Sequence, residues 1–193
     1  MVAPVNDGAT QLVALRARIA GCQRCPLHSD RSQIVFGSGP APARLMIIGA
    51  GPGAEEDAAG QLWQGEAGAL LDRMLAAMGL FRAEVYLASL VMCQLPEGQV
   101  PSAESIKSCT PFLRSQLVAI VPDVVLILGE PAARFFMNDG AAMADLRGRW
   151  WTLLDRPAIA SHSLQAVLAD ASLKRESWAD LQQVMSRLGL RRP

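Results

Sequence analysis

Net charge, aromatic residues and long apolar runs are all scarce in this chain of 193 residues. Eighteen lysine and arginine residues balance 18 aspartate and glutamate residues, so the formal net charge is zero and no global basic field marks a nucleic-acid binder. Any nucleic-acid binding must then come from local basic loops, helix N-termini and backbone amides. Aromatic residues make up 5% of the chain while alanine and glycine are frequent, which suits a compact α/β protein.

The apolar segments that mark exported and membrane proteins are also lacking. Residues 1–10 are polar and have no continuous apolar stretch of the kind found in signal peptides. No stretch is apolar enough to cross a bilayer. We therefore expect a cytoplasmic protein without a membrane partner, in a compartment where structural disulfides are rare. The length fits one domain, residues 1–193, with residues 1–10 as a flexible N-terminus.

Four cysteines are present, and their spacing is the most informative feature of the sequence. Cys22 and Cys25 form a C-x-x-C pair after a helical segment, and Cys93 and Cys109 follow far downstream. Four thiolates that converge usually hold zinc or an iron–sulfur cluster. Two disulfides or four unrelated core thiols are the alternatives. His28 is interpreted as a surface residue, because four cysteines are enough for a metal site.

Apolar runs and amphipathic segments alternate along the chain. Short apolar runs predict buried strands, and apolar spacings of three and four predict amphipathic helices. The alternation predicts a three-layer α/β/α fold, with a central, mainly parallel four-stranded sheet and a cysteine-bearing N-terminal segment. The predicted strands are residues 44–49, 84–91, 122–129 and 156–161, and the predicted helices are residues 11–20, 65–78, 102–121, 130–137 and 173–188.

Binding sites in open parallel sheets lie at the carboxyl ends of the strands. The sequence therefore directs attention to residues 49–57, 89–93, 129–131 and 161–165, which follow or end the four predicted strands. We expect these segments to meet at one edge of the sheet.

The motifs at these strand ends resemble the family 4 uracil-DNA glycosylases, the iron–sulfur group of the uracil-DNA glycosylase superfamily. The resemblance covers residues 15–188, nearly the whole chain. A lone C-x-x-C pair is a weak signal, whereas four cysteines interleaved with these motifs in the right order are a strong one. The matching segments are, in order, Cys22-x-x-Cys25-Pro26-Leu27, Arg31, residues 35–39, residues 45–53 with Glu56 and Asp57, residues 60–72, residues 85–93 with Pro96 and Pro101, Cys109-x-Pro111-Phe112-Leu113, Leu128-Gly129, Arg147-Gly148 and Lys174-x-x-x-Trp178-x-Asp180-Leu181.

The resemblance implies a [4Fe–4S] cluster bound by Cys22, Cys25, Cys93 and Cys109. Such a cluster would be structural, because it would fasten the N-terminal segment to the loop after the second strand. Zinc is the alternative metal. The spacing of the last two cysteines is long for a zinc ribbon, which usually repeats the C-x-x-C pair.

The resemblance also implies roles at the first strand end and in the segment that follows it. The loop after the first strand would present backbone amides to a base that is flipped out of the DNA helix. Most family 4 members carry a carboxylate where this chain has Ala50. An aromatic side chain that stacks on the base is retained as Trp63. The implied catalytic residues here are Ala50, Gly51 and Asp57, and the implied base-binding residues are Gly49, Pro52, Gly53 and Trp63.

Two further positions are implied at the later strand ends. An asparagine that grips the edge of the base in the family corresponds to Ser89, which is too short for the same bidentate contact. The family brings an imidazole to the leaving base from a His-Pro-Ser loop, and this chain has His162, Ser163 and no proline there. His162 is the catalytic candidate, although the alignment puts Ser163 in register. Three of the four contributions are therefore altered, which puts ordinary uracil excision in doubt.

The segment from Arg147 to Trp151 is the best candidate for a DNA contact. Arg147 and Arg149 would neutralise phosphates, and Trp150 and Trp151 would stack on bases or wedge between them. The alternative is that the tryptophans pack against the sheet edge and the arginines are solvated.

The sequence thus predicts a monomeric DNA repair glycosylase that hydrolyses the N-glycosidic bond of uracil or another deaminated base in DNA, with an atypical active site. The alternative is a catalytically degenerate iron–sulfur protein of the same fold that binds DNA or a partner protein. A zinc-bound α/β hydrolase of unrelated purpose is a third and more distant alternative.

Overall fold

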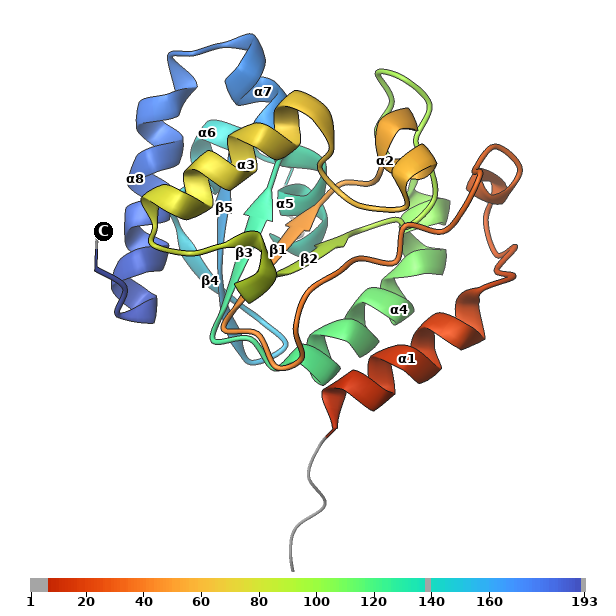
Figure 1. Cartoon of the computed structure of the whole chain (residues 1–193). Helices are drawn as coiled ribbons and strands as arrows, with labels where there is room; N and C mark the ends of the chain where they lie inside the picture. Colours follow the sequence, from red (N-terminus) through yellow and green to blue (C-terminus); the bar gives the residue numbers. More distant parts are fainter. Residues whose placement is uncertain (1–6, 138–139, 192–193) are drawn as a thin grey trace, which may run out of the picture.

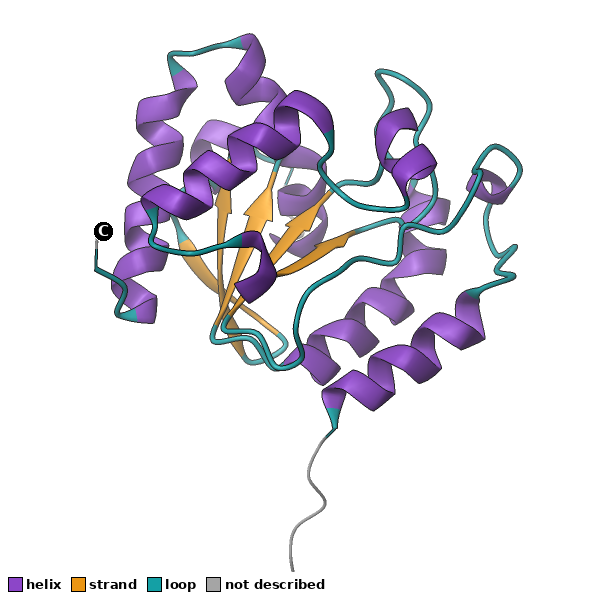
Figure 2. Ribbon diagram, viewed as in Figure 1, coloured by secondary structure: helices purple, strands orange, loops and turns teal. Residues whose placement is uncertain are grey.

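A computed structural model describes residues 7–137 and 140–191 of the chain. Figure 1 shows a central sheet with helices on both sides, and Figure 2 separates the strands from the helices around them. The helices are α1 (Gly8–Ile19), α2 (Ala54–Ala59), α3 (Gly65–Ala77), α4 (Ala103–Ile120), α5 (Glu130–Met137), α6 (Met143–Leu146), α7 (Leu164–Ala169) and α8 (Leu173–Leu188), with the 3-10 turns η1 (Pro26–His28) and η2 (Arg82–Glu84).

The sheet has five strands in the order β2-β1-β3-β5-β4. The strands are β1 (Leu45–Gly49), β2 (Tyr86–Ser89), β3 (Val124–Leu128), β4 (Trp150–Leu153) and β5 (Arg156–Ser161). Four pair in parallel, and β4 pairs antiparallel with β5. The predicted α/β/α fold and its four strands are confirmed, but the strand count was wrong by one, because the edge strand β4 was not recognised.

Burial on both faces explains why the parallel strands read as uninterrupted apolar runs. Every residue of β1, β2 and β3 is buried. Successive side chains alternate between two cores: Met46 and Ile48 belong to the core under α1, α4, α5 and α6, whereas Leu45 and Ile47 belong to the core under α3, α7 and α8. The strands therefore need apolar residues at every position.

The N-terminal helix packs along α4 on one face of the sheet (Figure 1). The approach is closest at Gly8, where an added Cβ would lie 2.1 Å from the carbonyl oxygen of Ala119. Asp7 caps α1 by accepting a hydrogen bond from the backbone N–H of Thr10. Part of the predicted flexible N-terminus is thus helical, and residues 1–6 lie outside the described residues. The chain leaves α1 directly into the segment that carries Cys22 and Cys25.

Candidate functional site

A cleft lies at the carboxyl ends of the parallel strands, where the sequence predicted a site. It encloses about 1010 Å³. All four predicted strand ends contribute to its wall. The cleft is lined by residues 49–56, 62–64, 66, 67, 89, 94–100, 128, 129, 131 and 163–165.

The loop after β1 is braced by backbone hydrogen bonds from the chain that follows β2. Gly49 accepts from the N–H of Leu90 at 2.9 Å, and Ala50 accepts from Val91 at 3.2 Å. The N–H of Gly53 donates to Oε2 of Glu56 at 2.9 Å, so this amide already has a partner. Residues 49–53 all line the cleft, and the side chain of Ala50 contributes only a methyl group.

The predicted catalytic residue Asp57 lies behind this loop and does not line the cleft. Its side chain is 1% exposed, and its carboxylate accepts hydrogen bonds from the backbone N–H groups of Ser32 at 2.7 Å and Gln33 at 3.4 Å. The placement favours a structural role, in which Asp57 fastens the segment after the cysteine pair to the start of α2.

Trp63 lies against the first strand end. Its side chain is 7% exposed and lines the cleft, and its backbone has a φ of 53°. An added Cβ on Gly49 would lie 2.9 Å from Cζ2 of Trp63, so glycine at position 49 leaves the space that the indole occupies.

Arg82 holds the Trp63 segment in place and was not recognised as important in the sequence. Its Nη1 donates to the carbonyl oxygens of Leu62 and Trp63, both at 3.2 Å, and its Nη2 donates to Gly68 at 3.1 Å. Nε pairs with Asp72 at 2.7 Å. Most partners of Arg82 are backbone carbonyl groups, which every residue type has, so the sequence does not reveal them. Only the pairing with Asp72, ten residues away, involves a side chain that the sequence shows.

Ser89 and Ser163 both line the cleft, from β2 and from the N-terminus of α7. Ser89 is 1% exposed, and its hydroxyl donates a hydrogen bond to the carbonyl oxygen of Val91 at 2.7 Å. Ser163 caps α7 by accepting from the N–H of Ala166 at 3.1 Å. Each serine hydroxyl therefore hydrogen-bonds to a nearby backbone group. The hydroxyl proton of Ser89 is used in this bond, so Ser89 has no donor left for a ligand.

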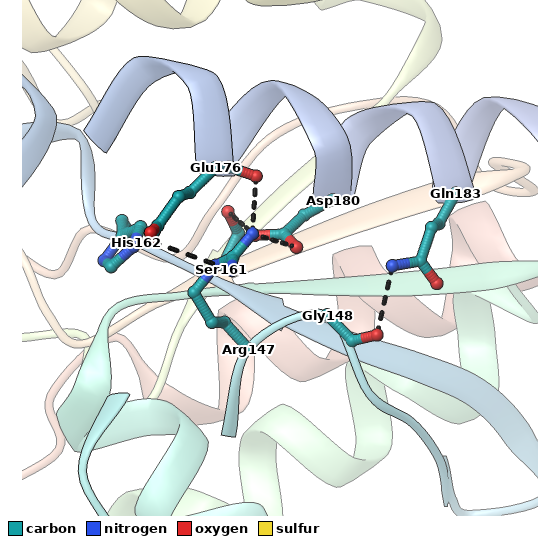
Figure 3. Close-up of polar contacts among 7 residues, drawn as sticks. All are labelled: Arg147, Gly148, Ser161, His162, Glu176, Asp180 and Gln183. Atoms are coloured by element: carbon teal, nitrogen blue, oxygen red, sulfur yellow. Dashed lines mark hydrogen bonds and ion pairs between the residues drawn. The ribbon is translucent and has the colours of Figure 1, made fainter. Parts of the chain in front are cut away.

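His162 is turned away from the cleft and does not line it. Its Nε2 lies 2.9 Å from Oε2 of Glu176 on α8 (Figure 3). This contact, followed by the charge of Arg147, lowers the pKa of Glu176. The structure thus brings Ser163, rather than the predicted His162, to the strand-end position that faces the cleft.

Arg147 lies beside Ala160 of β5 and is part of a polar network that joins β5 to α8 (Figure 3). It donates to Oδ1 and Oδ2 of Asp180 at 2.8 and 3.1 Å and to the carbonyl oxygen of Glu176 at 2.6 Å. Ser161 donates to Asp180 at 2.7 Å. Burial raises the pKa of Asp180, and the contacts with Ser161 and Arg147 act in the opposite direction. The placement favours a structural role for Arg147 over the predicted phosphate contact.

The rest of the predicted DNA-binding segment divides between surface and core. Arg149 is exposed, and its Nη1 donates to the carbonyl oxygen of Asp145 at 3.3 Å. Trp150 and Trp151 are half-buried on opposite faces of β4, each packed against a different core. Arg187 lies 5.4 Å above the ring of Trp150. The two tryptophans therefore pack against the sheet edge.

The four cysteines lie close to one another. The charges of Cys22, Cys25 and Cys93 each raise the pKa of the Cys109 thiol, which requires that all four thiols share one neighbourhood. Burial raises the pKa of Cys109 to about 12 and also raises that of Cys93. Among the described residues, no group of three or more His, Cys, Asp or Glu side chains is arranged to hold a single metal ion.

Arg31 joins the two halves of the cysteine neighbourhood. Its Nη1 donates to Sγ of Cys93 at 3.1 Å, and its Nη2 donates to the carbonyl oxygen of Cys22 at 2.7 Å. The C-x-x-C loop also contacts α4, because Ser108 donates to the carbonyl oxygen of Arg24 at 3.2 Å. His28 is half-buried, and its Nδ1 lies 2.8 Å from the carbonyl oxygen of Cys25.

Within residues 7–137 and 140–191, no helix is both long and apolar enough to span a lipid bilayer.

Comparison with known proteins gives a consistent family. The model of the uracil DNA glycosylase superfamily matches residues 36–182. The type-4 uracil-DNA glycosylase of Archaeoglobus fulgidus is 32% identical over 185 residues, which cover 91% of this chain and 92% of the relative. The type-4 uracil-DNA glycosylase of Thermotoga maritima is 39% identical, and this match spans 63% of each chain. The crystal structure of Pedobacter heparinus SMUG2 matches with a TM-score of 0.49 and 14% identity, over 76% of this chain and 75% of that one.

Proposed function

Since the chain belongs to the uracil-DNA glycosylase superfamily, we propose that it is a DNA repair glycosylase that hydrolyses the N-glycosidic bond of uracil or another deaminated base in DNA. The observation that carries the proposal is the composition of the cleft. The β1 loop, Trp63, Ser89 and Ser163 come from four separate parts of the sequence and line one cavity of about 1010 Å³. That volume accommodates a flipped nucleoside.

The proposed roles follow from the groups that face the cleft. The base stacks on Trp63, and the backbone amides of Ala50 and Gly51 donate to its carbonyl oxygens. Ser89 accepts a hydrogen bond from the edge of the base, because its own proton is bound to Val91. Ser163 keeps a hydroxyl proton that it donates to the leaving base. Water attacks the sugar as the glycosidic bond breaks, and the chain supplies positioning for this step.

We further propose that Cys22, Cys25, Cys93 and Cys109 hold a [4Fe–4S] cluster. A four-iron cluster is larger than one ion, so its four ligands stand further apart than the ligands of zinc. This fits thiols that share a neighbourhood without forming a single-ion site. The contact from Arg31 to Cys93 fits a sulfur that carries negative charge. When bound, the cluster supplies a structural link between α1, the β2 loop and α4.

We propose that the protein works as a monomer of one domain in the cytoplasm. The exposed guanidinium of Arg149 is retained as a candidate phosphate contact. DNA binding then rests on local contacts, since the whole chain has no net charge.

A degenerate protein that binds DNA or a partner without cleaving is the second candidate. The observation that favours it is that Ala50, Ser89 and Ser163 stand at the three altered positions and all line the cleft. None of them carries a charge. Removal of one group that stabilises transition-state charge typically slows an enzyme by about 10²–10³.

One assay separates the two candidates. Oligonucleotides that contain uracil, hypoxanthine or xanthine are incubated with enzyme in excess, and abasic sites are measured. We expect slow release of at least one base by the wild type. The variant Ala50→Glu, Ser89→Asn is expected to release uracil faster by about 10²-fold or more. If the wild type forms no abasic product and the double variant does, the degenerate candidate is correct.

A further inference from the structure

Among the residues that the structure describes, only Arg31 hydrogen-bonds to a cysteine sulfur through its side chain. Its Nη1 donates to Sγ of Cys93 at 3.1 Å, and its Nη2 donates to the carbonyl oxygen of Cys22 at 2.7 Å. Cys22 belongs to the C-x-x-C pair after α1, and Cys93 belongs to the loop after β2. One guanidinium therefore bridges two parts of the sequence that supply cysteines.

The positive charge of Arg31 has no carboxylate partner in the described part of the chain. None of the ion pairs within residues 7–137 and 140–191 includes Arg31, although this residue is half-buried. A charge that is partly removed from water is costly unless a group of opposite charge lies beside it. The group that this cation contacts is the sulfur of Cys93, so the contact favours negative charge on that sulfur independently of the cysteine spacing.

The backbone that carries Arg31 is fixed from its other side. The N–H groups of Ser32 and Gln33 donate to the carboxylate of Asp57 at 2.7 and 3.4 Å, and Asp57 is 1% exposed. The side chain of Gln33 also donates to the carbonyl oxygens of Asp57 and Ala58, at 2.8 and 3.1 Å. The guanidinium is therefore pre-organised beside the sulfur.

We propose that Arg31 sets the reduction potential of the four-cysteine site and protects it from oxidation; this inference rests on the proposed [4Fe–4S] cluster. Oxidation transfers one electron to an external one-electron acceptor, and the cluster with its thiolates becomes less negative by one charge. A cation that is hydrogen-bonded to a ligand sulfur stabilises the more negative form, so Arg31 raises the potential and disfavours the transfer. Arg31 acts through Cys93 and is a positioning residue. Its bond to Cys22 also holds the C-x-x-C loop against the Cys93 loop, which slows the release of iron.

The test measures the one-electron reduction potential by voltammetry, on protein prepared without oxygen whose iron has been counted. We expect Arg31→Gln to lower the equilibrium constant for reduction by about tenfold, which is about 59 mV for a one-electron couple. Arg31→Lys keeps the charge but cannot hold Cys22 and Cys93 at once. It should restore most of the potential and still lose iron to a chelator about tenfold faster than the wild type.

Arg24→Gln is the matched control, because it removes a guanidinium from the same C-x-x-C loop. Arg24 is exposed, and its guanidinium lies 4.9 Å from the centre of the Phe112 ring rather than on a sulfur. Solvent screens an exposed charge, so this variant should change the equilibrium constant for reduction by less than about twofold. Circular dichroism checks that each variant folds.

The outcomes separate this inference from the proposed function and cofactor. Wild-type protein without iron would overturn the cofactor and the inference together, while release of bases from DNA is decided by its own assay. Iron-loaded Arg31→Gln with the potential of the wild type, or with a shift equal to that of Arg24→Gln, would overturn the inference alone, because a merely structural role leaves the potential unchanged. If Arg31→Gln holds too little iron for voltammetry, the chelator decides. Faster loss of iron from Arg31→Lys than from Arg24→Gln supports the inference, and equal loss overturns it.

Discussion

The buried pair of Arg147 and Asp180 permits a direct test of whether this arginine belongs to the fold or to a DNA contact. The Asp180 side chain is 1% exposed, that of Arg147 is 18% exposed, and two hydrogen bonds join them. Breaking such a pair leaves an uncompensated buried charge, so Arg147→Met or Asp180→Asn should each lower the free energy of unfolding by about 3–5 kcal/mol. The double variant leaves neither charge alone and should lose less than the sum of the single losses.

The assay is denaturant unfolding followed by circular dichroism, with DNA affinity measured in parallel at several salt concentrations. Asp123→Asn provides the matched control, because it removes a carboxylate from the exposed pair with Arg44, whose side chains are 62% and 54% exposed. That change should lower the free energy of unfolding by about 0–1 kcal/mol. Arg147→Met refutes the reasoning if it leaves the free energy of unfolding within about 1 kcal/mol of wild type. The refutation also requires that the slope of log DNA affinity against log salt concentration becomes shallower by about one.

Four further results are expected. Gly49→Ala should displace the indole of Trp63, lower stability by about 1–3 kcal/mol, and change the tryptophan fluorescence; an unchanged spectrum would contradict the close contact at 2.9 Å. The hydrogen bond from His162 lowers the pKa of Glu176 below its ordinary 4.5, so the carboxylate stabilises the fold above pH 4.5 and this stabilisation is lost as the pH falls through the lower folded-state value. Glu176→Gln should therefore flatten the decline of the unfolding free energy below pH 4.5, and an unchanged decline would argue against the contact. Protein prepared without oxygen should contain about four irons per chain and absorb visible light. After iron is removed by chelation, Cys109 should be alkylated more slowly than the half-buried cysteines, since its pKa is raised to about 12.

The sequence predicted the elements whose burial alone determines their residue pattern. Strands buried on both faces must be apolar throughout, so β1 and β3 were visible as short apolar runs. The edge strand β4 is half-buried or exposed at every position, and the sequence left open whether its two tryptophans contact DNA or pack against the sheet edge. An edge strand of this kind has no continuous apolar run, and its pairing with β5 depends on a turn that the sequence does not mark with glycine.

The site shows the same division. Residues next to strand ends, such as Gly49 and Ser89, were predicted to meet, because parallel strands carry their carboxyl ends to one edge. The roles of Arg147 and Asp57 were not predictable, since their partners are 33 and 25 residues away in the sequence and are chosen by packing. Whether His162 or Ser163 faces the cleft depends on one step of register, which flips a side chain to the opposite face.

The short stretch from Arg31 to Gln33 joins the cysteine-bearing end of the molecule to the wall of the cleft. Arg31 donates a hydrogen bond to Sγ of Cys93, and the backbone N–H groups of Ser32 and Gln33 donate to the carboxylate of Asp57 within α2. A change in the order of the cysteine segment would therefore be transmitted through two hydrogen bonds to α2, whose first residues form part of the cleft wall.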